Sequence, residues 1–174
     1  LYQNDTLNLE ILKDPIDSNL HISDEGIQLI KNHEGLSLEA YQLKDGKITI
    51  GYGHAEPDYI FSFKLGDTIS MEEAEALFEY DIQKAENGVI RLFQMWKNNG
   101  LEIKVSQHMW DAMVSMAYNM GVNGFRGSDI VQYLKQGKYL EAADEILATK
   151  IDDEFPGLKD RREEERNLFL KNLI

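Results

Sequence analysis

Residues 33–54 read HEGLSLEAYQLKDGKITIGYGH, and this stretch decides the fold that we predict. It starts at the end of an expected helix over 23–34, which Gly35 terminates. Asp45-Gly46 then separates two short runs, 41–43 and 48–50, which is the pattern of a two-residue β-hairpin. We therefore expect a helix followed by a hairpin or a short sheet.

Helices are expected throughout the chain beyond this stretch. The capping box from Ser70 to Glu73 opens a helix over 70–86. Glycines separate five further candidates, which are 88–98, 104–119, 128–136, 139–149 and 158–171. We predict an α+β fold with a small lobe over about 35–69 and a larger helical lobe over about 70–174 plus the 23–34 helix, joined by the helix that starts at Ser70.

The first 22 residues are irregular and acidic, and Pro15 interrupts any long helix. We predict that residues 1–22 form an arm or linker before a single 23–174 domain. The chain starts at Leu1 rather than at methionine, so we expect a processed product or a piece of a longer protein. The first 15 residues lack the basic and apolar regions of a signal peptide, so we do not expect them to be one, and no run of about 18 apolar residues predicts a membrane-spanning helix.

Composition excludes several functional classes. The chain of 174 residues has a hydrophobic fraction of 43%, which is enough for a packed core in one domain or one domain with two lobes. It contains no cysteine, so disulfides, thiolate metal sites and thiolate nucleophiles are excluded. The net charge of −13 argues against nonspecific binding to nucleic acid or to anionic membrane, because both require a basic surface. With no membrane-spanning run in the sequence, no membrane insertion is expected.

The residues around the hairpin suggest acid catalysis. Glu34 is expected at a helix C-terminus, where the negative end of the helix dipole favours a protonated carboxylate, as a general acid requires. Thr49 offers a hydroxyl that can hold a water molecule, and Gly51 and Gly53 allow a ligand to approach the backbone closely. A surface glutamate beside an ordinary hairpin is the alternative that spacing alone leaves open.

A longer sequence pattern helps to decide whether Glu34 is a catalytic acid or a surface glutamate. It consists of Glu34, Gly35, Leu36, Tyr41, Thr49, Ile50, Gly51, Tyr52, Gly53 and His54. This pattern resembles that of the phage-type lysozymes, the endolysin family of glycoside hydrolases. Three later segments continue the resemblance in the same order, so that it covers about residues 23–174: ISMEEAEALFEYDI at 69–82, AYNMGVNGF at 117–125 and GLKDRREEERNL at 157–168.

The resemblance implies a lysozyme-like fold and a role for each matching residue. Glu34 would be the general acid that protonates the glycosidic oxygen, and Thr49 would position a water molecule. The residues expected to line the sugar groove are Gly51, Tyr52 and Asn119. His54 and Asp81 are expected to form a structural pair. Arg161 and Arg162 are expected either near the cleft or on a solvated helix face.

One position departs from the family pattern. The family places an aspartate, or sometimes a cysteine, where this chain has Leu43, whose side chain cannot act as a base or nucleophile. Asp45 or Asp58 is a candidate substitute, and we prefer Asp58, although Asp45 also fits an ordinary turn and Asp58 an ordinary loop acid. Glu34 could otherwise act alone in a lytic transglycosylase, or the chain could be a non-catalytic glycan-binding or structural module.

We therefore expect a muramidase that hydrolyses the β-1,4 bond between N-acetylmuramic acid and N-acetylglucosamine in peptidoglycan. Protonation and charge stabilisation carry this chemistry, so no cofactor or metal is expected. The expected partners are glycan strands and, because an acidic enzyme meets anionic walls slowly, other proteins of a phage tail or particle. The expected locations are the virion, or the host cytoplasm before action in the periplasm or cell wall.

Overall fold

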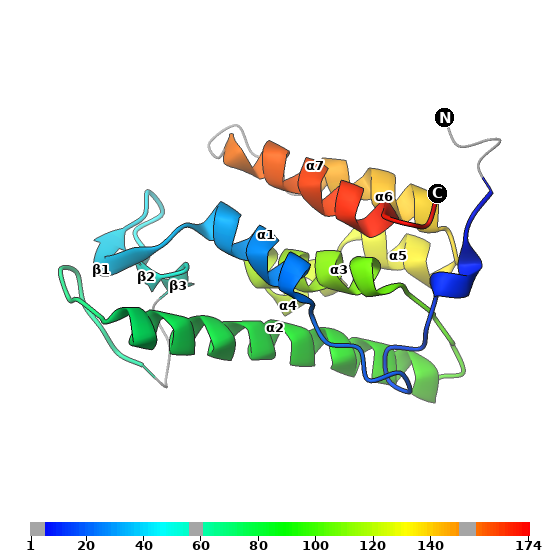
Figure 1. The fold of residues 1–174 in the computed structure, drawn as a ribbon, viewed down its shortest axis with the longest axis horizontal. Helices are drawn as coiled ribbons and strands as arrows, with labels where there is room; N and C mark the ends of the chain where they lie inside the picture. The colour runs from blue at the N-terminus through cyan, green and yellow to red at the C-terminus, as the bar shows by residue number, and fades with distance from the viewer. Residues whose placement is uncertain (1–5, 56–60, 150–155) are drawn as a thin grey trace. The chain divides into compact units, whose positions relative to one another are not determined.

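The computed structural model describes residues 6–55, 61–149 and 156–174. It contains two compact units, a small unit, Ile30–Lys84, and a helical unit formed by Leu1–Leu29 and Ala85–Ile174. Two helices, α1 (Asp24–Glu34) and α2 (Met71–Asn98), have residues in both units (Figure 1). The predicted α+β class is confirmed by this combination of helices with one small sheet.

The sheet of the small unit is built around the predicted hairpin. Strands β1 (Ser37–Gln42), β2 (Ile48–Gly51) and β3 (His54–Ala55) form an antiparallel sheet in the order β1-β2-β3. The turn places Gly46 at φ +89°, and Leu43 N donates to Lys47 O over 2.8 Å. The hairpin is thus confirmed, but its loop is longer than the predicted two residues, because Gln42 pairs with Ile48 and Gly46 N donates to Leu43 O over 2.9 Å. Strand β3 is an additional strand that the sequence pattern did not predict.

The small unit has its own hydrophobic core, which joins the sheet to the start of α2. The buried members of this core are Ala40, Ile50, Phe63, Ile69 and Ala74. The predicted capping box is confirmed, because Ser70 N donates to Glu73 Oε2 over 2.7 Å and Glu73 N donates to Ser70 Oγ over 3.0 Å. This cap fixes where α2 begins beside the sheet.

The helical unit packs around a larger core. Its helices are α3 (Gln107–Met120), α4 (Val122–Arg126), α5 (Asp129–Lys135), α6 (Tyr139–Ala148) and α7 (Gly157–Leu170). α7 contacts both α3 and α6, and α6 contacts α5 (Figure 1). Trp110, Phe125 and Phe169 are fully buried between them. Among the described residues, none of the helices has both the length and the apolar character that crossing a membrane requires.

The predicted break at Gly88 is wrong, because α2 runs without interruption from Met71 to Asn98. A Cβ atom added at Gly88 would lie 2.7 Å from Val122 Cγ1, so the glycine serves a close helix contact rather than a helix end. α4 also occupies part of the glycine-rich segment 121–127, which we expected to separate two helices. Tertiary packing therefore overrides the usual role of glycine as a helix terminator.

The described part of the predicted arm or linker, residues 6–22, belongs to the helical unit and packs against the rest of it. Lys13 forms an isolated antiparallel bridge with Val105, and Asn8 N donates to Leu173 O over 2.8 Å. Leu20 belongs to the buried core, and several partly buried side chains of this segment pack against it: Leu7, Ile11, Leu12 and Ile16. Burial of these apolar groups explains why the segment follows the surface of the unit.

Candidate active site

Glu34 is held against the turn between β2 and β3. It is the last residue of α1, and Gly35, at φ +69°, donates its N–H to Lys31 O over 3.0 Å to end the helix. A Cβ atom added at Gly53 would lie 3.2 Å from Glu34 Cδ and would overlap Glu34 Oε2. Gly53 also has φ +81°, so this position favours glycine for both its conformation and its contact with the carboxylate.

The sheet places two further groups of the predicted site on one of its faces. Burial raises the pKa of Tyr41, and the negative charge of Glu34 raises it further, so the two side chains interact. Tyr41 stands directly opposite Thr49 in the β1–β2 register. Because opposite residues of an antiparallel pair project from the same face, Thr49 lies on the face of the sheet from which Tyr41 projects.

Thr49 carries a buried hydroxyl that the described residues leave without a hydrogen bond. Its side chain is buried, and Oγ1 makes no hydrogen bond with any residue that the structure describes. Most buried hydroxyl groups in proteins do have a partner. The Thr49 hydroxyl is therefore available to bind a water molecule or a ligand.

The glycine turn and its tyrosine are firmly packed. Gly51 has φ +66° and is buried beside Ile69 and Ala74. Tyr52 is 8% exposed, and its hydroxyl donates to Glu75 Oε1 over 2.9 Å. The predicted contact of Gly51 and Tyr52 with sugar stays a prediction, and the hydrogen bond to Glu75 assigns Tyr52 a packing role as well.

His54 and Asp81 are in direct contact. His54 Nδ1 lies 2.8 Å from Asp81 Oδ2, and the imidazole is 3% exposed. An ionised carboxylate only accepts hydrogen bonds, so Nδ1 carries the hydrogen of this pair. The ring also packs near Phe61 and Phe63, at centroid distances of 6.3 and 5.9 Å. These contacts suit a structural role, because the bond joins β3 to α2.

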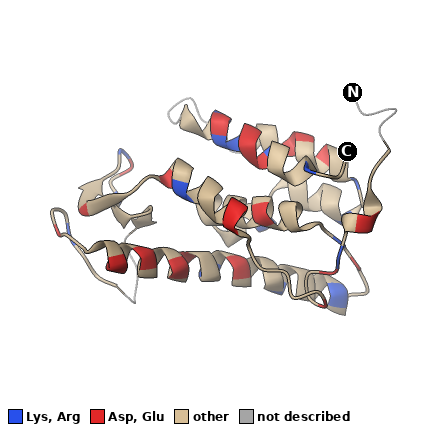
Figure 2. Ribbon diagram, viewed as in Figure 1, with Lys and Arg blue, Asp and Glu red and all other residues tan. Residues whose placement is uncertain are grey.

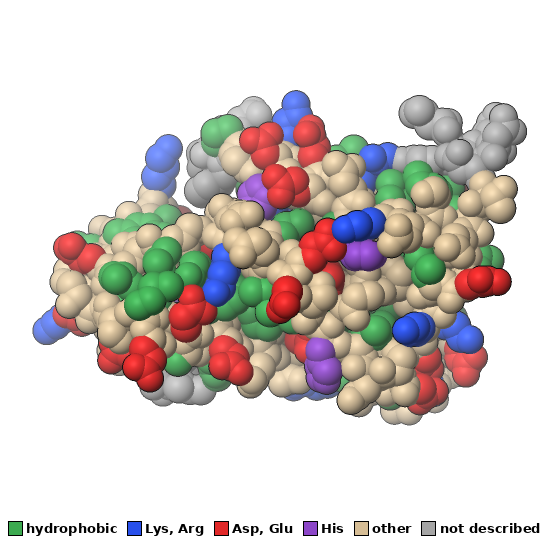
Figure 3. Space-filling view, in the orientation of Figure 1, with side chains coloured by type: hydrophobic (Ala, Val, Ile, Leu, Met, Phe, Trp, Pro, Cys, Tyr) green, Lys and Arg blue, Asp and Glu red, His purple; other side chains and the backbone are tan. Residues whose placement is uncertain are grey.

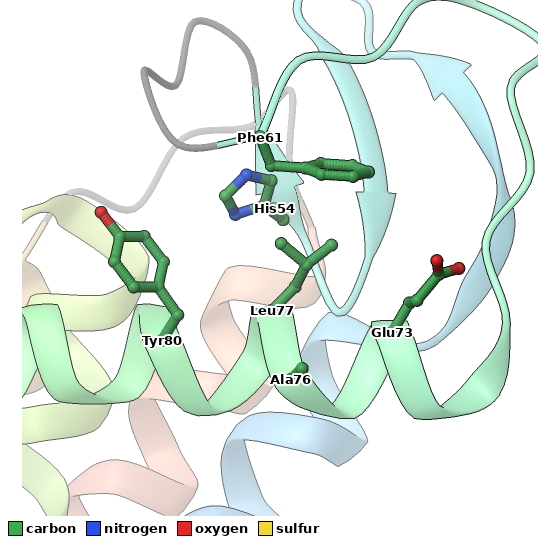
Figure 4. Close-up of a pocket in the computed structure, with 6 residues that line it drawn as sticks. All are labelled: His54, Phe61, Glu73, Ala76, Leu77 and Tyr80. Atoms are coloured by element: carbon green, nitrogen blue, oxygen red, sulfur yellow. The ribbon is translucent and has the colours of Figure 1, made fainter.

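A mostly apolar pocket of about 380 Å³ lies on another side of His54 (Figure 4). The described residues that line it are His54, Phe61, Glu73, Ala76, Leu77 and Tyr80. Figure 4 shows Leu77 rising from α2 toward His54, with Tyr80 beside it on the same helix. Neither Glu34 nor Thr49 is among these described lining residues, so the pocket is distinct from the site around Glu34.

In the helical unit, Asn119 is held by a buried ionic network. Arg162 Nη2 donates to Asn119 Oδ1 over 2.6 Å, and Arg162 Nη1 donates to Glu165 Oε2 over 2.6 Å. Arginine only donates, so the Asn119 amide must direct its oxygen to Arg162, which leaves its NH₂ group to other acceptors. Arg161 and Arg162 are both buried. The prediction that they could lie on a solvated helix face is therefore wrong for both.

Of the two candidates for a second carboxylate, Asp45 and Asp58, the structure describes only Asp45. Asp45 Oδ1 accepts from Lys47 N over 3.0 Å, and Oδ2 lies 3.8 Å from Lys47 Nζ, which are the contacts of an ordinary turn. Asp58 lies outside the described residues.

Leu43 is 36% exposed, and Leu36 and Leu38 are also exposed in the same unit, where Figure 3 shows hydrophobic side chains at the surface.

A family model of phage lysozymes matches residues 31–165. The chain belongs to the phage lysozyme family. The resemblance predicted from the sequence is thus confirmed. The protein is a lysozyme, a glycoside hydrolase that degrades peptidoglycan.

Individual proteins of this family align over most of the chain. The endolysin of Acyrthosiphon pisum secondary endosymbiont phage 1 is 35% identical over 156 residues, which cover 86% of this chain and 98% of that protein. The endolysin of Bacillus phage B103 is 39% identical over 87% of this chain, which spans only 54% of that longer protein. In a solved structure, the muramidase domain of SpmX from Asticaccaulis excentricus is 33% identical, with a TM-score of 0.70 over 87% of this chain and 99% of that domain.

Proposed function

We propose that this lysozyme hydrolyses the β-1,4 bond between N-acetylmuramic acid and N-acetylglucosamine, with Glu34 as the general acid. The observation that carries the proposal is the contact of the Glu34 carboxylate with the backbone at Gly53. Only glycine leaves room for this contact, because a Cβ atom at this position would overlap Glu34 Oε2. Tyr41 and the Thr49 hydroxyl, which the described residues leave without a hydrogen bond, lie at the same face of the sheet. Thr49 would supply a group that binds water, whereas glycoside hydrolysis also requires a second carboxylate besides the acid.

In the proposed reaction, Glu34 donates its proton to the glycosidic oxygen as the bond to the anomeric carbon breaks. A water molecule held by Thr49 then adds to that carbon, and a base accepts the proton of the water. An inverting pair of carboxylates would be separated by about 6.5–9.5 Å, whereas a retaining pair would be closer to about 5 Å. Because Leu43 cannot be the base and Asp45 belongs to a turn, Asp58 remains our candidate.

Leu43 favours one alternative reaction. In lytic transglycosylation, Glu34 protonates the same oxygen, the 6-hydroxyl of the sugar attacks the anomeric carbon, and its proton returns to Glu34. No second carboxylate is needed, because no water is activated. Mass spectrometry of digested peptidoglycan separates the two reactions, since hydrolysis leaves reducing ends and transglycosylation leaves 1,6-anhydro ends.

The Glu34→Gln variant tests the proposed acid. Glutamine keeps the size of the side chain but cannot donate the proton, so we expect peptidoglycan cleavage to fall by about 100- to 10,000-fold. Glu72→Gln is the matched control, because Glu72 is an exposed acid of the same unit. The proposal is wrong if Glu34→Gln cleaves peptidoglycan at the rate of the wild type while Glu72→Gln behaves normally.

We further propose that the enzyme is delivered to the wall as part of a larger particle or phage protein. The chain has 31 acidic and 18 basic residues, and acidic residues are spread along α2 and α7 (Figure 2). This charge opposes encounter with an anionic wall. We expect weak binding to purified walls at low ionic strength, with no further loss when salt is added. Tight binding at low salt that is lost at high salt would contradict the delivery proposal.

A further inference from the structure

One lysine connects three elements of the small unit. Lys31, in the last turn of α1, donates from Nζ to both carboxylate oxygens of Glu75 on α2, over 3.0 and 2.7 Å. The same ammonium lies 4.9 Å from the centroid of the Tyr52 ring and 5.0 Å from that of Phe78. Both distances fall within the range of cation–π interactions. We call Lys31, Tyr52, Glu75 and Phe78 the Lys31 cluster.

The cluster is closed by contacts among its other members. Tyr52 Oη donates to Glu75 Oε1 over 2.9 Å, and the Tyr52 ring packs against Phe78 with centroids 5.1 Å apart. The hydrogen bonds from Lys31 lower the pKa of Glu75, so this carboxylate is ionised at neutral pH. Tyr52 is therefore fixed by a hydrogen bond at its hydroxyl and by a cation and an aromatic ring at its faces.

The Lys31 cluster connects the two segments that determine where the Glu34 carboxylate lies, which are the end of α1 and the turn that contains Gly53. Lys31 precedes Glu34 by three residues, and its carbonyl accepts the hydrogen bond that ends the helix at Gly35. Tyr52 directly precedes Gly53, on which the carboxylate rests. A shift of the helix end relative to the turn would therefore move the Glu34 carboxylate away from Gly53.

We propose that Lys31 is a positioning residue for the reaction, which acts by fixing the last turn of α1 to the turn that carries Gly53. The proposal rests on the proposed role of Glu34 as the general acid. Lys31 itself transfers no proton and touches no reacting atom. Its effect is on the geometry of Glu34, and small displacements of a catalytic group can lower a rate by about 100-fold.

The exposure of the pair determines how the effect should be measured. The side chains of Lys31 and Glu75 are 23% and 43% exposed, and ion pairs of this kind contribute little to global stability. Loss of the pair should therefore leave the protein folded. Its consequence should be found in kcat rather than in thermal stability or in substrate affinity.

The experiment compares three substitutions in the full chain. Lys31→Met keeps the aliphatic part of the side chain and removes the charge, whereas Lys31→Arg keeps the charge. Lys97→Met is the matched control, because Lys97 also bridges two carboxylates, those of Asp14 and Asp17, but lies in the helical unit. We would measure kcat and KM on soluble peptidoglycan fragments, together with thermal unfolding, at a temperature where every variant is folded.

We expect Lys31→Met to lower kcat by about tenfold or more with KM within about twofold of the wild type. Lys31→Arg should recover most of kcat, and Lys97→Met should leave it unchanged. A wild-type kcat in Lys31→Met overturns the inference, as does a loss no larger than that in Lys97→Met. Glu34→Gln separates the two proposals: if it is inactive while Lys31→Met is normal, only the inference fails, and if it is active, the proposed function fails.

Discussion

At the scale of single residues, Gly53 links backbone conformation to the proposed chemistry. Its φ of +81° is a conformation that residues with a Cβ atom rarely adopt, and the missing side chain leaves the space that Glu34 fills. The Thr49 hydroxyl is the complementary case, since its position is fixed by the sheet while its hydrogen-bonding capacity is unused by the described residues. Gly53 thus makes room for a carboxylate, and the sheet places a hydroxyl that the described residues leave without a hydrogen bond.

We expect Gly53→Ala to reduce cleavage by about 100-fold or more, because the new methyl group displaces the Glu34 carboxylate. The left-handed conformation should cost about 1–2 kcal/mol of unfolding free energy. Turnover measurements and urea denaturation would check the two effects separately.

Gly66→Ala is the control for this prediction. Gly66 has φ +87°, yet a Cβ atom there meets no other atom within 4 Å. It should therefore lose a similar amount of stability and keep its activity. Equal activity losses in the two variants would show that backbone strain, rather than contact with Glu34, explains the result.

At the scale of elements, α2 shows how a helix accommodates a glycine that normally weakens it. Gly88 lies within the helix, where alanine would be favoured by about 1 kcal/mol on intrinsic propensity. Val122 of α4 occupies the space where the alanine methyl group would lie. Because overpacking costs about 1–3 kcal/mol, steric exclusion outweighs propensity at this position.

Gly88→Ala should therefore lower the free energy of unfolding by up to about 2 kcal/mol, the overpacking cost less the gain in propensity. Gly88→Ala should cost less stability in the Val122→Ala background than in the wild type, because both Cγ atoms that overlap the methyl group are then absent and only Val122 Cβ, 3.0 Å away, remains in close contact. Urea denaturation of the wild type, both single variants and the double variant gives the coupling energy. A Gly88→Ala protein that is more stable than the wild type would contradict this explanation.

At the scale of the whole molecule, acids outnumber bases, and individual lysines hold one or two carboxylates each. Lys171 lies 2.6 Å from Glu25, and Lys31 lies 2.7 Å from Glu75. The hydrogen bond from each lysine is the main cause that lowers the pKa of its glutamate below the ordinary value of 4.5. The folded state therefore binds these protons less readily than the unfolded chain does.

This difference predicts a loss of stability in acid. The contribution of both glutamates is present above pH 4.5 and is lost as the pH falls through their lowered folded pKa values. Protonation also relieves repulsion among the excess acids, so the wild type must be compared with Lys171→Met. We expect urea denaturation between about pH 6 and 3 to show a smaller loss of stability for the variant. Parallel curves for the two proteins would contradict this account.

The sequence by itself determined the features that depend on neighbouring residues. The Asp45-Gly46 turn, the Ser70–Glu73 capping box and the helix end at Glu34 each follow from conformational preferences within a few residues. The spacing from Glu34 to His54 also identified the family, because it combines these local structures in a specific order. These features can be predicted because the interacting groups are adjacent in the chain.

Only the tertiary structure decided the contacts between distant segments. It placed Gly88 inside a continuous helix, buried Arg162 against Asn119 and joined Lys31 to Glu75, which lies 44 residues away. The same lysine or arginine would be an ordinary surface residue if its partner lay elsewhere. Such contacts depend on how the chain returns to itself, and the energies that select them arise from packing and burial that local sequence patterns do not contain.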